Sequence, residues 1–286
     1  MSTYGQLITD AMRELERLEY SDAALEAKEL LGKVLGADCR STDFEAKLWE
    51  QANDKEEKEF SALCDRRLAG EPLQYILGEW DFYGITFSVG KGVLIPRQDT
   101  ELLVDTAIKL RGSEEATELI DLCAGSGCIG LVLEKKLKNV SLTLVENYTD
   151  AMSYLLTNKL NFSSRAKVLK GDVMDESLPA QQQAADMIVC NPPYLTASDM
   201  ESLQTEVRAE PVEALYGGED GLDFYRGIVR LWKNALKPGG YMVFEVGAGQ
   251  ADEVAELMIQ HGFVNVRRAK DLSGIERVVY GAYKAD

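Results

Sequence analysis

The spacing of hydrophobic positions divides the chain into a helical first part and a mixed second part. Up to about Gly70, apolar residues recur at helical intervals, as at Leu7, Ile8, Met12 and Leu15. Three pairs of polar residues can cap the N-termini of later helices: Ser21-Asp22, Ser41-Thr42 and Asn53-Asp54. Pro72 prevents the last of these helices from continuing. The pattern predicts four helices and no strand in this part.

The second part begins with alternating aromatic and branched residues. Residues 80–95 combine them with glycines, which predicts a short β-hairpin. After it, apolar strand patterns alternate with helical ones. The predicted strands are 117–123, 140–146, 166–170, 186–190, 241–246, 263–268 and 277–283. This alternation predicts an α/β fold with a mostly parallel, doubly wound sheet and helices on both faces.

A chain of 286 residues is long enough for two domains. We expect a helical domain over 1–78, then a sheet domain over 79–286 with the hairpin linker at about 79–95.

Composition narrows the choice of partners. The formal net charge is -17, which repels nucleic acids and anionic membranes, so we expect neither as a partner. Five cysteines without a CxxC pair argue against disulfides and zinc, and they favour a reduced, cytoplasmic protein without a metal. We find no signal peptide and no apolar run of membrane-spanning length. The single histidine, His261, excludes catalysis by a Ser-His-Asp triad.

A glycine-rich turn follows the first long strand. Gly125, Gly127 and Gly130 form a GxGxxG pattern, which is common to sites for NAD, FAD and S-adenosylmethionine. Asp121, just before the turn, favours S-adenosylmethionine, because its carboxylate can bind an ammonium group and repels a pyrophosphate.

Two more acids follow later strands. Glu146 ends the second strand, where a carboxylate can grip ribose hydroxyls. The alternative is a solvent-exposed acid at a strand end. Asp172, after the third strand, can accept a hydrogen bond from an adenine amino group, and the alternative is a turn-forming Gly-Asp pair.

The fourth strand ends in Asn191-Pro192-Pro193-Tyr194. The two prolines stop the strand and fix its backbone, which suits a site that must aim a few polar atoms. A carboxamide nitrogen is a poor nucleophile, because disrupting its resonance costs about 18–20 kcal/mol. If the Asn191 oxygen and the Pro192 carbonyl accept its two N–H groups, each bond can supply about 3–4 kcal/mol to the transition state. Tyr194 can stack on the amide plane.

These motifs together resemble the HemK/PrmC family of release factor glutamine methyltransferases. The resemblance extends over nearly the whole chain. It rests on residues 71–78, on 93–97 with Thr100-Glu101, on 121–129, on 191–194 and on 277–279. It implies a helical domain that helps to hold the substrate, and S-adenosyl-L-methionine as methyl donor. It also implies methylation of the glutamine N5 in the Gly-Gly-Gln motif of class-1 peptide chain release factors. Cys123 and Asn191 join the cofactor contacts that it implies.

The chain departs from the family pattern at a few positions: Gln98 and Asp99 after Arg97, Glu146-Asn147 at the second strand end, and Ile275-Glu276 before Arg277. Three other functions fit parts of the sequence. A non-catalytic binding module could act through its helical domain alone, but it would not need the glycine turn and residues 191–194 together. An adenine-N6 DNA methyltransferase has a similar Asn-Pro-Pro-Tyr motif, although the acidic charge argues against it. An NAD-dependent oxidoreductase explains the glycine turn but not the residues 191–194.

Overall fold

The computed structural model describes residues 2–18, 21–112 and 116–284. The chain forms two compact units. One comprises Met1–Glu79 together with Gln204–Ala209, and the other comprises Trp80–Leu203 and Glu210–Asp286. Each unit is described by itself below.

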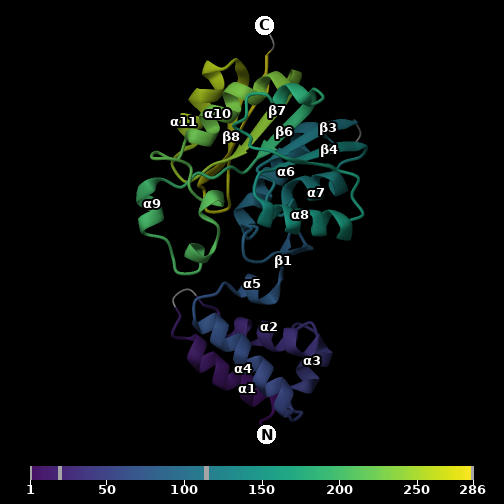
Figure 1. The fold of residues 1–286 in the computed structure, drawn as a ribbon, viewed down its shortest axis with the longest axis vertical. Coiled ribbons are helices and arrows are strands. Elements are labelled where there is room, and N and C mark those ends of the chain that lie inside the picture. The colour runs from purple at the N-terminus through teal and green to yellow at the C-terminus, as the bar shows by residue number, and fades with distance from the viewer. Residues whose placement is uncertain (1, 19–20, 113–115, 285–286) are drawn as a thin grey trace. The chain divides into compact units, whose positions relative to one another are not determined.

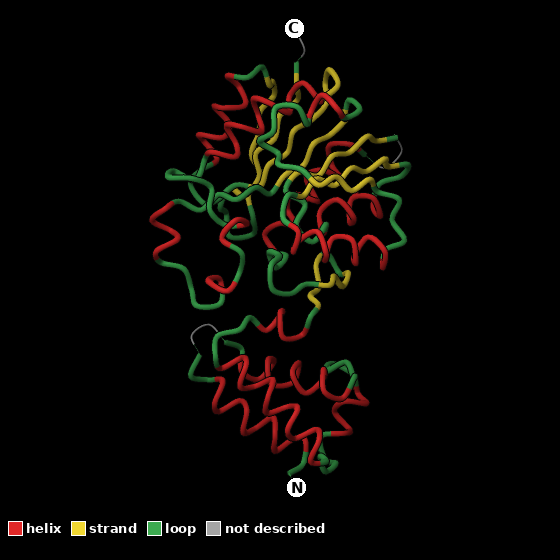
Figure 2. Tube along the Cα trace, in the orientation of Figure 1, coloured by secondary structure: helices red, strands yellow, loops and turns green. Residues whose placement is uncertain are grey.

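The first unit is helical (Figures 1 and 2). Its helices are α1 (Tyr4–Leu15), α2 (Ala23–Leu35), α3 (Thr42–Lys47), α4 (Asp54–Leu68) and α5 (Leu73–Leu77). The predicted caps form, because the side chains of Asp22, Ser41 and Asn53 accept hydrogen bonds from the first turns of α2, α3 and α4. Leu15, Leu30 and other apolar residues of these helices share one core. The pattern predicted four helices in this part of the chain, and the one-turn helix α5 is an additional one.

A buried arginine joins a distant segment to this unit. Arg67 of α4 is only 1% exposed. Its guanidinium binds the Glu26 carboxylate through two hydrogen bonds of 2.7 and 3.1 Å, and Glu206 through one of 2.5 Å. Residues 204–209 therefore pack with the helices, although they lie more than a hundred residues further along the chain. The sequence pattern did not predict this.

The second unit contains a hairpin and a seven-stranded sheet. The hairpin is β1 (Glu79–Phe82) with β2 (Ile85–Ser88). The sheet has the order β5-β4-β3-β6-β7-β9-β8. Its strands are β3 (Thr117–Leu122), β4 (Val140–Glu146), β5 (Lys167–Lys170), β6 (Ala185–Cys190), β7 (Leu236–Glu245), β8 (Phe263–Lys270) and β9 (Glu276–Tyr283). The first five pair in parallel, and β9 runs antiparallel to β7 and β8.

Helices cover both faces of this sheet. They are α6 (Glu101–Arg111), α7 (Cys128–Lys136), α8 (Thr149–Asn161), α10 (Asp223–Trp232) and α11 (Ala251–Gln260), and the short α9 (Ala197–Glu201) lies in the loop after β6. Side chains of the strands alternate between two cores. Ile188 and Phe244 belong to the core that also contains residues of α10 and α11, whereas Val189 and Val243 belong to the core of α6, α7 and α8. The predicted fold class, a helical domain, a hairpin and a doubly wound sheet, is confirmed.

One strand begins five residues before its predicted start. β7 begins at Leu236, whereas the sequence pattern began it at Tyr241, because Pro238-Gly239-Gly240 resembles a strand-breaking turn. The strand continues through this segment with a shift of register opposite residues 185–187. Gly239 adopts a positive φ of 79°, which is typical of a bulge.

Candidate active site

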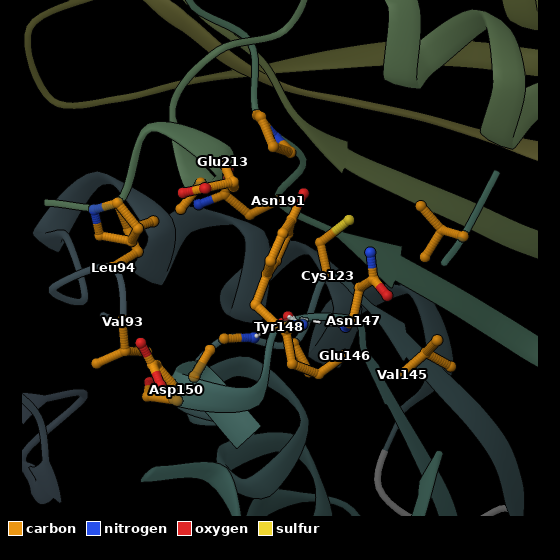
Figure 3. A pocket seen from close by; sticks show the side chains of 18 of the residues that line it. Val93, Leu94, Cys123, Val145, Glu146, Asn147, Tyr148, Asp150, Asn191 and Glu213 are labelled. Atoms are coloured by element: carbon orange, nitrogen blue, oxygen red, sulfur yellow. Dashed lines mark hydrogen bonds between the residues drawn. The ribbon is translucent and has the colours of Figure 1, made fainter. Parts of the chain in front are cut away.

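A cavity of about 310 Å³ lies at the carboxyl ends of β3, β4, β5 and β6 (Figure 3). In a parallel sheet these strand ends meet at one edge, where ligands bind in doubly wound folds. The residues predicted from the sequence that line it are Cys123, Gly125, Glu146, Asp172, Asn191 and Pro193. All of these belong to the sheet unit. The chain thus brings the glycine turn, two of the strand-end acids and the Asn-Pro-Pro motif together.

The turn after β3 leaves the strand in a left-handed conformation. Cys123, Gly125 and Gly127 have φ values of 57°, 55° and 81°, a region that glycine adopts without strain. Gly130 has a different role. A Cβ atom there would lie 2.5 Å from Leu144 Cδ2 and 2.9 Å from Asp121 Oδ2. The third glycine therefore lets α7 pack closely against the sheet. Gly125 lines the cavity, whereas Gly127, which was also predicted to bind the cofactor, is the N-cap of α7 and lies outside the lining.

Asp121 lies beneath this turn and does not line the cavity. It is fully buried, and its Oδ2 accepts a 2.8 Å hydrogen bond from the Gly130 N–H. Its Oδ1 has no hydrogen-bond partner among the residues that the structure describes. Burial raises the pKa of Asp121 to about 7, although the Gly130 N–H lowers it. In this arrangement the carboxylate supports the turn from below, instead of facing the cavity as the sequence reasoning expected.

Glu146 lines the cavity and is held by main-chain donors. Its Oε2 accepts from Gly125 N, and its Oε1 accepts from Asn147 N and Tyr148 N, each at 2.8 Å. It is only 5% exposed, so it is not the solvent-exposed acid of the alternative interpretation. A carboxylate offers about four lone-pair positions, and three are in use. One position remains for a ligand hydroxyl, and the orientation of the group is fixed.

Asp172 lies on the cavity wall and also forms a turn. Its Oδ1 accepts from Met174 N at 2.9 Å. The neighbouring Gly171 donates its N–H to the Glu146 carbonyl at 3.0 Å. The Gly-Asp pair therefore forms the turn of the alternative interpretation, and Asp172 also lines the cavity.

The Asn-Pro-Pro-Tyr motif crosses the end of β6. Asn191 and Pro193 line the cavity, whereas Pro192 is buried outside the lining. The Asn191 Nδ2 donates to Thr100 Oγ1 at 3.3 Å. Tyr194 does not line the cavity. It packs beside the core of α10 and α11, and its burial raises its pKa well above the usual range.

A glycine-rich segment supports the backbone of this motif. A Cβ atom on Gly217 would lie 2.6 Å from Tyr194 Cα and 2.7 Å from the Pro193 carbonyl oxygen. One on Gly221 would lie 2.3 Å from the Tyr194 carbonyl oxygen. The Gln250 side chain donates to that same oxygen at 2.9 Å. Only glycine allows this close approach, which holds the Asn-Pro-Pro-Tyr backbone in place.

Several residues of the site had not been assigned a role from the sequence. Tyr148 and Glu213 line the cavity (Figure 3). Glu210 is 4% exposed, accepts from Ile95 N at 3.0 Å and binds the Arg97 guanidinium. Isolated polar residues in loops give no pattern that marks them, so the structure was needed to find these residues.

Two classes of feature are missing from the described ranges 2–18, 21–112 and 116–284. No cluster of three or more histidine, cysteine or acidic side chains could hold a metal ion there. Within the same ranges, no helix is long and apolar enough to cross a membrane.

Comparison with known proteins adds to this geometry. Residues 6–78 match the family described as "PrmC N-terminal domain", and residues 98–219 match "Methyltransferase small domain". A release factor glutamine methyltransferase of Geobacter sulfurreducens is 40% identical over 91% of this chain and 89% of its own length. One of Clostridium botulinum is 34% identical over 96% of each chain. A solved methyltransferase from Pyrococcus furiosus, 16% identical, covers 79% of this chain and 100% of its own, with a TM-score of 0.55. At 16% identity, the Pyrococcus furiosus structure supports the fold alone.

Proposed function

The chain belongs to the release factor glutamine methyltransferase family, and on this basis we propose that it methylates the N5 nitrogen of a glutamine side chain in the Gly-Gly-Gln motif of a class-1 peptide chain release factor. The observation that carries the proposal is the meeting of Asn191 and Pro193 with the Glu146 carboxylate on one cavity. A site for a methyl donor and a site for a planar amide thereby share one wall.

The cavity suits S-adenosyl-L-methionine, which supplies an electrophilic methyl group. Its volume of about 310 Å³ lies within the range of small-molecule pockets. Glu146 offers its remaining acceptor position to a ribose hydroxyl, and Asp172 has a carboxylate oxygen free of the turn bond for an adenine amino group. Gly125, on the cavity wall, keeps the turn open for close approach to the backbone. We assign Asp121 to the support of this turn, through its bond to Gly130 N.

The acceptor amide needs hydrogen-bond acceptors rather than a base. The Asn191 oxygen, on the cavity wall, accepts one N–H group. We assign the other N–H to the main-chain carbonyl of Pro192, whose ring is buried outside the lining, and the nitrogen lone pair then turns toward the methyl group. This preorganisation stabilises the positive charge that develops on nitrogen. The proton leaves after attack, so the reaction needs no histidine. Since Tyr194 lies outside the cavity lining, we assign it to packing that fixes the motif rather than to stacking on the amide.

The alternative acceptor is adenine in DNA. An adenine must be flipped from its stack, which costs a few kcal/mol that contacts to phosphates offset. A net charge of -17 opposes such contacts. A glutamine on a flexible loop enters without unstacking.

The helical unit, residues 1–79 with 204–209, is the part that we propose holds the release factor. Five free cysteines support a reducing compartment, the cytoplasm, as the location.

A methylation assay tests the proposal. The protein is incubated with radiolabelled S-adenosylmethionine and an intact release factor, with a release factor whose motif glutamine is changed to alanine, or with adenine-containing DNA. We expect label on the intact release factor alone. Label on the DNA, or equal label on both release factors, would refute the assignment. The Asn191→Ala variant serves as the inactive control for the enzyme.

A further inference from the structure

A buried acid that the sequence reasoning did not consider lies behind Asn191. Glu245 is the last residue of β7, it is 2% exposed, and it does not line the cavity. β6 and β7 pair in parallel with Cys190 opposite Phe244. Asn191 directly follows β6, and Glu245 ends β7, so the two residues come next to each other beyond this pair, on the same face of the sheet.

Thr100 occupies that face at the start of α6. It is 2% exposed. Its Oγ1 accepts the 3.3 Å hydrogen bond from Asn191 Nδ2. Side-chain hydrogen bonds from Thr100 and from Asn191 itself both lower the pKa of Glu245. The Glu245 Oε2 has no hydrogen-bond partner among the residues that the structure describes. The carboxylate thus interacts with the site through its other oxygen.

The chemistry of these three groups fixes the direction of the bonds between them. An ionised carboxylate only accepts hydrogen bonds, so the single Thr100 hydroxyl hydrogen points to Glu245. The Thr100 oxygen then has lone pairs alone to offer Asn191, which must present its NH2 group. The Asn191 oxygen consequently faces away from Thr100, toward the cavity that Asn191 lines.

We propose that Glu245, both directly and through Thr100, sets the orientation of the Asn191 amide so that its oxygen is the atom offered to the substrate. Glu245 is a positioning residue, because it touches neither the cavity nor the reacting atoms. This proposal rests on the proposed function, in which the Asn191 oxygen accepts a substrate N–H. With no acid behind Thr100, the Thr100 hydroxyl can rotate. The Asn191 amide can then flip and present its NH2 group to the N–H of the substrate, so that no hydrogen bond forms.

The groups around Glu245 set the conditions for a test. Burial raises its pKa to about 7, against the hydrogen bond from Thr100. The other charged and titratable groups that interact with it are Asp99, Arg277, Tyr194, Tyr225, Cys128 and Cys190. At pH 8.5 Glu245 is ionised, and the direction of the bonds is fixed as described.

The sharpest test reverses the donor and acceptor roles in the hydrogen bonds among Glu245, Thr100 and Asn191. In Asn191→Asp, two acceptors compete for one hydroxyl hydrogen, and we expect kcat at pH 8.5 to fall by at least a hundredfold. In the double variant Asn191→Asp/Glu245→Gln, the introduced glutamine donates to Thr100, and Thr100 donates to the introduced aspartate. The second oxygen of that aspartate then faces the substrate, so we expect kcat at least tenfold above that of Asn191→Asp. With Asn191 intact, the same Glu245→Gln change lowers kcat.

Two Thr100 variants complete the design. Thr100→Ser keeps the hydroxyl, so kcat stays within threefold of the wild type. Thr100→Val removes the hydroxyl and reduces the recovery in the double variant to the part that the direct contact between positions 245 and 191 supplies. If Glu245 only filled space, Glu245→Gln would act in the same direction whether Asn191 is intact or replaced by aspartate. That result, or an Asn191→Asp enzyme within threefold of the wild type, would overturn the proposal.

Urea unfolding of the same variants gives a readout that needs no substrate. We expect Asn191→Asp to shift the folding equilibrium toward the unfolded state, and Glu245→Gln to reverse that shift by at least tenfold. Additive effects on stability would refute the coupling. If the wild-type protein does not label a release factor, the proposed function fails. The stability measurements still test the direction of the hydrogen bonds among Glu245, Thr100 and Asn191.

Discussion

Replacing Asp121 with asparagine should make the stability of the sheet unit less sensitive to pH. Asp121 is fully buried, its Oδ1 is without a hydrogen-bond partner in the described part of the chain, and its pKa is raised from 3.8 to about 7. The asparagine side chain has nearly the same shape. Its oxygen can keep the bond to Gly130 N, and it carries no charge at any pH.

The size of the effect follows from linkage. A carboxyl whose pKa is raised on folding contributes stability that is fully present below its unfolded pKa and is lost as the pH rises through its folded pKa. For Asp121 this window runs from 3.8 to about 7. At 1.36 kcal/mol per pKa unit, ionisation between pH 5 and pH 8 removes roughly 2–3 kcal/mol from the free energy of unfolding. Asp121→Asn has no such loss.

The measurement is the free energy of unfolding in urea at pH 5, 6, 7 and 8. Trp49 is 87% exposed and belongs to the helical unit, so Trp49→Phe in both proteins lets Trp80 and the buried Trp232 report the sheet unit. We expect the variant to gain roughly 2–3 kcal/mol relative to the parent between pH 5 and pH 8. Other titrating groups, Glu245 among them, cancel in the difference. A constant difference across this range would refute the reasoning, because Asp121 would then titrate alike in the folded and unfolded states.

Three further predictions concern the site. Glu146→Ala should weaken binding of S-adenosylmethionine at least tenfold in titration calorimetry, because a charge-assisted bond is worth about 1.5–3 kcal/mol; unchanged affinity would remove Glu146 from the cofactor site. Asn191→Ala should bind the cofactor within threefold of the wild type and lose methyl transfer, and near-normal kcat would contradict the proposed acceptor geometry. Gly130→Ala should lower the free energy of unfolding by roughly 1–3 kcal/mol through overpacking against Leu144, and an unchanged urea midpoint would count against the close approach of α7.

Much of the fold was predictable because local patterns and tertiary packing agree. β4 spans the predicted residues 140–146, and the capping residues Asp22, Ser41 and Asn53 begin helices as expected. Burial on both faces produces continuous apolar strands in a parallel sheet, and these are easy to recognise. The bulge in β7 was not recognised, because Pro238-Gly239-Gly240 has the composition of a turn.

Long-range polar contacts were not predictable in the same way. The bonds that Arg67 makes with Glu26 and Glu206 join residues far apart in the chain, and no local pattern encodes them. Glu245 did leave a signal. It is a lone acid in the apolar run 241–246, and a charged residue there must be paired or titrated. That rule would have marked it as part of a site.

The three acids at strand ends show why residue type alone does not assign a role. Asp121, Glu146 and Glu245 are all nearly or fully buried at the carboxyl edge of the sheet, yet each is held by different donors. Three main-chain N–H groups hold Glu146 on the cavity wall, a single N–H holds Asp121 beneath the turn, and side chains surround Glu245 behind Asn191. Burial raises the pKa of both Asp121 and Glu245 to about 7. The position of its hydrogen-bond donors therefore determines whether such an acid can bind a ligand or positions a neighbouring group.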